Sequence, residues 1–274
     1  MKRILVGIAT LVSMFTTGAG AADLAARPYT KAPPAVVEVY NWTGFHIGAN
    51  VGYSWGRSDD SVLISRFATG FPLNAAAGRN DVNGAIGGGQ IGYNWQLTNW
   101  LVGLEADIQA SGERGSLGFT CLACADDGTN ITSVVTQRLN WFGTVRGRAG
   151  FLVTPSILLY GTGGFAYGEV QTGGSITGNN IAGNPVTALF PGTSSTRTGW
   201  TAGAGIEGRI TGNWTAKLEY LYMDLGSVSA GPIATTILVP VRTNAGVSYT
   251  SSFTDNIVRV GVNYRFGGPV VARY

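Results

Sequence analysis

Apolar and polar residues alternate with a period of two along several segments of the chain. In residues 258–266, valines and aromatic residues fall on one parity, and Arg259, Gly261, Asn263 and Arg265 fall on the other. A strand with one apolar and one polar face requires this period, whereas a helix would spread both sets around its circumference. The segment is therefore predicted to be an amphipathic β-strand.

Seven further segments also read as strands, and in most of them the charges lie on one side. The eight predicted strands lie at about 43–56, 82–97, 100–111, 135–153, 157–169, 200–210, 215–222 and 258–266. In the third, Glu105 and Asp107 lie opposite Val102 and Leu104. The fourth puts Arg138, Asn140, Thr144, Arg146 and Arg148 opposite Leu139, Trp141, Gly143, Val145 and Ala149. The facing of the fifth is left open, because it is nearly all apolar or glycine.

The connections between these strands alternate between short and long. Turns near 98, 154 and 211 recur about every 57 residues. The long connections cover about 57–81, 112–134, 170–196 and 227–252. Outer-membrane barrels show this asymmetry. The sequence therefore predicts an all-β fold: an eight-stranded antiparallel transmembrane β-barrel with short periplasmic turns and four long external loops.

Six tryptophans fall near the ends of the predicted strands. Amphipathic indoles belong at both rims of a lipid-facing band, whereas core packing would not favour strand ends. The predicted aromatic girdle consists of Trp42, Trp55, Trp95, Trp100, Trp200 and Trp214.

The N-terminal residues have the three zones of a secretory signal peptide. A basic start at Lys2 and Arg3 precedes an apolar run and a small-residue stretch, and cleavage is predicted between Ala21 and Ala22. The apolar run is shorter than the roughly 20 residues that a spanning helix needs. The predicted divisions are a signal peptide (1–21), a proline-bearing periplasmic tether (22–40), the outer-membrane barrel (41–267) and a C-terminal tail (268–274).

The amino-acid composition also favours a membrane barrel over an ordinary soluble domain. The 274 residues include 42 glycines, which is about twice the usual share of glycine. Charged residues make up 12% of the chain, which is about half of their usual share. Removing Lys2 and Arg3 with the signal peptide lowers the formal net charge from +3 to +1. This balance does not point to nucleic acid as a partner.

The two cysteines, Cys121 and Cys124, lie in a loop-like stretch. In an exported protein, a local disulfide between them is favoured over free thiols. A redox-active pair would need a thioredoxin-like βαβ context, and a metal site would need more ligands.

Several motifs together resemble a known family. They are the start at 22–33, the segments Tyr40–Phe45 and Val51–Gly56, the segment Lys217–Gly226 and the ending Asn263–Phe266. The chain is similar to the small porin-like surface-antigen family of eight-stranded outer-membrane barrel proteins of Gram-negative bacteria. The resemblance implies an abundant protein of the cell outer membrane, and some members are linked to haem binding or host interaction.

The last predicted strand also resembles the signal that the barrel-assembly machinery recognises. Arg259, Gly261, Tyr264 and Phe266 carry its spacing. Residues 268–274 follow Phe266, so either Tyr274 is the recognised aromatic end or these residues form a periplasmic appendage.

The polar parity is predicted to face the lumen. Eight strands enclose an interior just wide enough for side chains to fill, and charges there must be paired or solvated. The predicted lumen ion-pair network consists of Glu105, Asp107, Arg146, Arg148, Glu207, Arg209, Lys217, Glu219, Arg259 and Arg265. His46, the single histidine, is interpreted as a polar filler of the lumen rather than a catalytic base or haem ligand. No catalytic residue, cofactor or metal is assigned.

The leading functional hypothesis is a structural barrel that supports envelope integrity and displays surface loops. The alternatives are a narrow porin, haem or host binding through the loops, and an enzyme acting on lipid through His46. The resemblance also implies that the α-amine of Ala22 can be joined to peptidoglycan. The other expected partners are outer-membrane lipid, lipopolysaccharide and the assembly machinery, and a monomer is expected.

Overall fold

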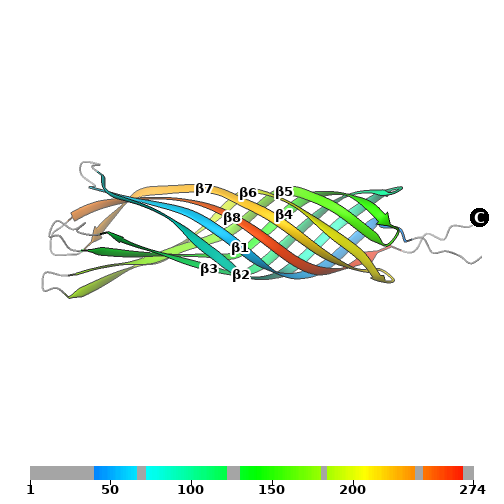
Figure 1. Cartoon of the computed structure of the whole chain (residues 1–274), viewed down its shortest axis with the longest axis horizontal. Coiled ribbons are helices and arrows are strands. Elements are labelled where there is room, and N and C mark those ends of the chain that lie inside the picture. Colours follow the sequence, from blue (N-terminus) through cyan, green and yellow to red (C-terminus); the bar gives the residue numbers. More distant parts are fainter. Residues whose placement is uncertain (1–39, 67–71, 122–129, 180–183, 238–242, 268–274) are drawn as a thin grey trace, which may run out of the picture. The chain divides into compact units, whose positions relative to one another are not determined.

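Eight antiparallel strands form a closed barrel (Figure 1). The computed structural model describes residues 40–66, 72–121, 130–179, 184–237 and 243–267. The strands are β1 (Gly44–Arg66), β2 (Pro72–Leu97), β3 (Trp100–Cys121), β4 (Ile131–Thr154), β5 (Ile157–Asn179), β6 (Pro185–Thr211), β7 (Trp214–Ile237) and β8 (Thr243–Phe266). Each strand pairs with the next, which confirms the predicted fold class. The predicted signal peptide and tail lie outside the described residues, as does the predicted tether apart from Tyr40.

The first and last strands close the barrel. β8 pairs with β1 from Phe45 opposite Phe266 to Arg66 opposite Ala245. The strand that carries the predicted assembly signal is therefore the closing strand, and its neighbours are β1 and β7. Whether these residues act as an assembly signal stays a prediction.

The two ends of the barrel are built differently. At one end, two-residue turns at 98–99, 155–156 and 212–213 join β2 to β3, β4 to β5 and β6 to β7. Gly212 has a φ of +50°, a left-handed conformation that glycine adopts without steric cost. This end, where β1 also begins and β8 also ends, is called the turn end below, and the opposite end is called the hairpin end.

The strands are longer than the alternation indicates. They contain 22 to 27 residues, whereas about 9 to 11 tilted residues cross a bilayer. Most of the residues predicted to form long connections extend the strands instead: β1 continues to Arg66 and β2 resumes at Pro72. The extensions went unrecognised because, beyond the lipid, neither face of the sheet has to be apolar.

The predicted facing is wrong in one part of β4. The pairing of β4 with β5 shifts register between Leu139 and Trp141, which marks a β-bulge at Asn140. The extra residue reverses the parity before it, so Leu139 is buried in the lumen while Arg138 and Asn140 are exposed. Past the bulge, the predicted facing is correct: the side chains of Thr144, Arg146 and Arg148 point inward.

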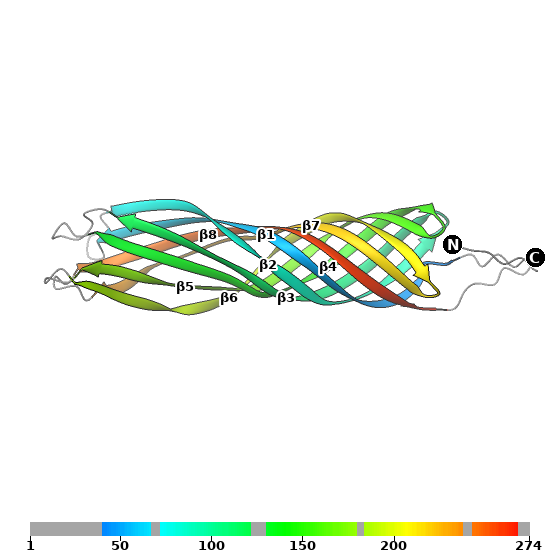
Figure 2. The ribbon, with the colours of Figure 1, turned by 60° about the horizontal axis from the view of Figure 1, so that its bottom comes forward.

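The outward side chains of the turn-end half, which lies on the right in Figure 2, form an apolar belt between two aromatic rings. The belt includes Ile47, Val51, Ile91, Leu104, Ile108, Val145, Ile206, Leu218 and Val260. The aromatic ring nearer the turn end consists of Phe45, Tyr93, Trp95, Trp100, Phe151, Trp214, Tyr264 and Phe266. The ring nearer the hairpin end consists of Tyr53, Trp55, Trp141, Phe165, Tyr167, Trp200, Tyr220 and Tyr222.

Among the residues that the structure describes, no helix is long and apolar enough to cross a membrane.

Candidate functional site: the charged lumen

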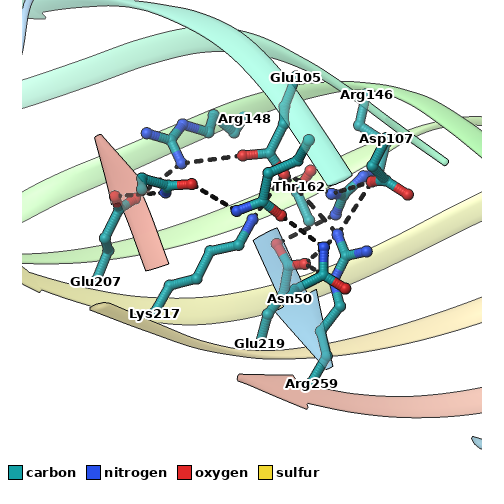
Figure 3. Close-up of polar contacts among 12 residues, drawn as sticks. Asn50, Glu105, Asp107, Arg146, Arg148, Thr162, Glu207, Lys217, Glu219 and Arg259 are labelled. Carbon is teal, nitrogen blue, oxygen red and sulfur yellow. Dashed lines mark hydrogen bonds and ion pairs between the residues drawn. The ribbon is translucent and has the colours of Figure 1, made fainter. Parts of the chain in front are cut away.

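Eight charged side chains from five strands meet inside the turn-end half of the barrel (Figure 3). Strict alternation brings them inward at successive positions of β3, β4, β6, β7 and β8. They are Glu105, Asp107, Arg146, Arg148, Glu207, Lys217, Glu219 and Arg259, and all of them are buried. Four are acidic and four are basic, so the cluster is balanced in formal charge.

Two arginines form the centre of this cluster. One guanidinium nitrogen of Arg146 lies 2.7 Å from Glu105 Oε1 and 2.9 Å from Asp107 Oδ2, and its other terminal nitrogen donates to Glu219 Oε1 at 3.1 Å. Arg259 donates to two of these three carboxylates, to Asp107 Oδ2 at 3.0 Å and to Glu219 Oε2 at 2.7 Å. Shared carboxylates join β3, β4, β7 and β8 across the lumen.

Lys217 and Arg148 extend the cluster. The Lys217 ammonium donates to Glu105 Oε1 at 2.8 Å. Arg148 donates to Glu207 Oε2 at 3.0 Å and to Asn94 Oδ1 at 2.9 Å. Removing a charge from water costs several kcal/mol, which only close pairing with additional hydrogen bonds offsets. The density of contacts here is what allows so many charges to be buried.

Two further polar side chains complete the cluster. His46 Nε2 lies 3.4 Å from Glu105 Oε2, and the Tyr160 hydroxyl donates to Glu219 Oε1 at 3.0 Å. Glycine at position 92 leaves room for the imidazole, because a Cβ there would lie 2.5 Å from His46 Cε1. His46 is thus enclosed by the charged cluster, away from the outer surface where a lipid substrate would lie.

Apolar layers close the charged cluster on both sides. Toward the turn end lie Tyr40, Trp42, Leu101, Leu152, Leu158 and Tyr160. Toward the hairpin end lie Val82, Ile86, Leu139, Phe142, Ala166, Val170, Leu221, Met223, Leu225, Phe253 and Ile257. The lumen of this half is therefore a packed core.

Two residues of the predicted network lie apart from it. Arg209 and Arg265 place their guanidinium carbons 4.8 and 4.7 Å from the ring centroid of Tyr40. Arg265 also donates to the Thr43 carbonyl at 3.1 Å, and Arg209 donates to the Gly212 carbonyl at 3.1 Å. Within the described part of the chain, neither arginine pairs with a carboxylate. Both lie at the turn end, beyond the reach of the inward carboxylates.

Trp42 does not belong to the outward girdle. It is only 1% exposed, its indole N–H donates to the Pro155 carbonyl at 3.1 Å, and its backbone N–H donates to Gln96 Oε1 at 2.8 Å. Trp42 precedes the first residue of β1, so the alternation of the strand does not govern its direction. The other five predicted tryptophans are 44% to 61% exposed on the outer surface.

A second buried group, which the sequence did not reveal, lies nearer the hairpin end. Asp255 accepts a short hydrogen bond from Ser54, and Glu113 binds Ser111, whose hydroxyl donates to it at 3.0 Å. Both carboxyl groups are buried, and each has one oxygen without a hydrogen-bond partner among the described residues. Asp255 has the same parity as Arg259, so the sequence could have indicated that it faces the lumen. Glu113 lies in a segment that was predicted to be a connection, where parity was not applied.

The predicted disulfide involves a residue that the structure does not describe. Cys121 ends β3, and Cys124 lies outside the described residues. The pairing therefore stays a prediction.

Comparisons with known proteins identify relatives over nearly the whole chain. Residues 8–266 match the family described as "Outer membrane protein beta-barrel domain". The 31 kDa outer-membrane immunogenic protein of Brucella melitensis is 34% identical over 276 residues, covering 97% of this chain and 100% of that protein. The 22 kDa outer membrane protein of Rhizobium leguminosarum bv. viciae is 28% identical, covering 82% and 79%.

Two solved structures are also similar. Ail, the attachment invasion locus protein of Yersinia pestis, has 14% identity and a TM-score of 0.31, covering 79% of this chain and 99% of that one. The outer membrane protease OmpT from Escherichia coli has 12% identity and a TM-score of 0.41, covering 84% and 99%.

Proposed function

Because the chain belongs to the family of outer membrane protein beta-barrel domains, we propose that it is a non-conducting structural barrel that contributes to envelope integrity. Family membership and residence in the outer membrane are as the sequence predicted. Its relatives are named immunogenic outer-membrane proteins. Because outer-membrane barrels have short periplasmic turns and longer external connections, the turn end faces the periplasm and the hairpin end faces outward.

The packed lumen is the observation that carries this proposal. Arg146 and Arg259 cross the interior to shared carboxylates, and apolar layers lie on either side. A porin needs a continuous aqueous path, and eight-stranded barrels have just enough interior for their own side chains. Solute passage would require breaking several buried ion pairs at once.

Single-channel recording tests the closed lumen directly. We expect the full mature protein, inserted into a planar bilayer, to show no stable conductance steps, while a general porin in the same bilayer does. The heat-dependent shift in gel mobility verifies that the inserted protein is folded. Reproducible steps from folded protein would instead establish the narrow-porin alternative.

Deletion of the gene tests the contribution to envelope integrity. We expect the deletion strain to become more sensitive to detergents and to large antibiotics, and the wild-type gene to restore resistance. Uptake of small solutes should be unchanged. A strain with normal barrier function but impaired uptake would contradict the proposal.

Attachment to peptidoglycan is a second proposal, supported by the way the chain joins the barrel. Tyr40 lies against two guanidinium groups and Trp42 is buried in the turn-end layer. A chain fixed in this way can transmit force from a periplasmic tether without unwinding β1. We propose that residues 22–40 form this tether and that the α-amine of Ala22 is the attachment point.

Digestion of purified sacculi tests this second proposal. We expect mass spectrometry to find an N-terminal peptide that begins at Ala22 and carries a muropeptide on its α-amine. Recovery of only the unmodified peptide would eliminate attachment and leave the structural role intact.

Binding of haem or host molecules stays a hypothesis, because much of the loop region lies outside the described residues.

A further inference from the structure

Two arginines face each other on the outer surface of the hairpin-end half. Arg114 of β3 and Arg138 of β4 are directly opposite in the register, and both side chains are exposed. Like charges in opposed positions destabilise an antiparallel pair. Within the described ranges, neither guanidinium forms an ion pair or a hydrogen bond with the protein.

The β-bulge is what brings these two side chains to the same face. Arg114 points outward by the regular alternation of β3, whereas uninterrupted alternation of β4 from Arg146 would have turned Arg138 into the lumen. The extra residue at Asn140 reverses its direction. Bulges that re-aim a side chain are commonly functional features of a sheet.

Two outward acidic side chains lie on the strands next to the arginine pair. Glu169 accepts a hydrogen bond from the indole of Trp141 at 3.0 Å. Asp81 lies directly opposite Arg57 in the pairing of β1 with β2. Among the described residues, neither carboxylate forms an ion pair with Arg114 or Arg138.

The arginine pair lies just beyond the apolar belt. Trp141, in the aromatic ring nearer the hairpin end, is three residues from Arg138, or about 10 Å along the strand. On β3, Ala110 is opposite Trp141, and Arg114 follows four residues later. The outer rim of the lipid-facing band is the level at which lipid headgroups lie.

We propose that Arg114 and Arg138 bind the phosphate groups of an anionic glycolipid in the outer leaflet. A guanidinium presents a planar fork that pairs two of its N–H groups with a phosphate, and two such forks can hold one phosphorylated headgroup. The bound phosphate would supply a direct ion-pair partner, which neither arginine has among the described residues. The inference rests on the outward direction of the hairpin end and is independent of whether the barrel conducts.

Binding of purified lipid A to the full mature barrel in detergent tests the proposal. The probes are bis-phosphorylated lipid A, its dephosphorylated form and inorganic phosphate alone, with native mass spectrometry as the readout. We expect the Arg114→Gln/Arg138→Gln variant to bind the phosphorylated form at least about tenfold more weakly, as expected for the loss of charge-assisted hydrogen bonds. The dephosphorylated form should bind wild type and variant equally.

Arg79→Gln is the matched control. Arg79 is also exposed and outward-facing, but it already pairs with Asp59 at 3.0 Å. We expect it to bind lipid A like wild type, and we expect Arg114→Lys/Arg138→Lys to retain part of the affinity. The heat-dependent mobility shift verifies that each variant is folded.

Besides one result with inorganic phosphate, three results with the lipid probes would overturn the proposal. They are unchanged binding by the double glutamine variant, an equal loss in Arg79→Gln, and equally tight wild-type binding of the dephosphorylated lipid. If inorganic phosphate bound at the concentration that saturates with lipid A, and did so through the same arginines, the site would be a simple anion site rather than a lipid site.

Discussion

The two halves of each strand obey different rules. In the turn-end half, outward residues are mostly apolar, and the inward residues between the two apolar layers are mostly polar or charged, as in β3 from Val102 to Asp107. In the hairpin-end half the same strands continue, but charged residues such as Arg57, Asp59 and Arg79 lie on the outer face. The alternation of apolar and polar residues therefore depends on the lipid around the strand, whereas strand pairing continues beyond the lipid.

The interior differs between the two halves as well. The turn-end half buries four acidic and four basic side chains in mutual contact. Nearer the hairpin end, Glu113 and Asp255 are buried without an ion pair to a basic side chain among the described residues. The turn-end half therefore places its buried charges in direct ion pairs, which offset the cost of removing them from water.

Removal of one shared carboxylate is expected to give the largest effect. Glu219→Gln keeps the shape of the side chain but leaves Arg146 and Arg259 with less counter-charge in a buried site. We expect a loss of about 3 to 5 kcal/mol in the free energy of unfolding. The urea midpoint of the folded barrel in lipid vesicles, followed by gel mobility, measures it. A midpoint equal to that of wild type would show that the network contributes little to stability.

A charge added to the outer surface is expected to give the second-largest effect, and its cost in stability should differ between the two halves. Leu104→Arg places a cation in the middle of the apolar belt, where it costs about 2 to 4 kcal/mol. Ser116→Arg adds the same charge to the same strand in the hairpin-end half, where we expect a change near zero. Both are measured by the same urea titration. Equal destabilisation by the two variants would contradict the assignment of Leu104 to the apolar belt and of Ser116 to the region outside it.

An exposed ion pair is expected to give the smallest effect. Arg79 and Asp59 lie 3.0 Å apart with both side chains largely in solvent. Water and salt screen such pairs, so Asp59→Asn should cost less than about 1 kcal/mol. The contrast with Glu219→Gln compares two ion pairs that differ mainly in burial. A loss as large as that of the buried variant would contradict the distinction between the halves.

Most of the lumen cluster was predictable, and its exceptions have identifiable causes. Inward positions of β3, β6, β7 and β8 follow directly from parity. Arg138 was misassigned because a bulge leaves no mark in an alternating pattern. Trp42 was misassigned because it lies before the strand. Arg209 and Arg265 share the lumen parity, but their distance from the carboxylates depends on how the strands are staggered. Parity predicts the face on which a residue lies and does not predict this stagger.

The amino-acid pattern was enough to predict the fold class, the number of strands and the parity of the segment 258–266, because lipid imposes a period of two on every strand that crosses it. Only the folded barrel shows how far each strand extends, which charges meet and which end of the lumen Trp42 closes. These depend on register and stagger around the closed barrel, properties of eight strands together and of none of them alone.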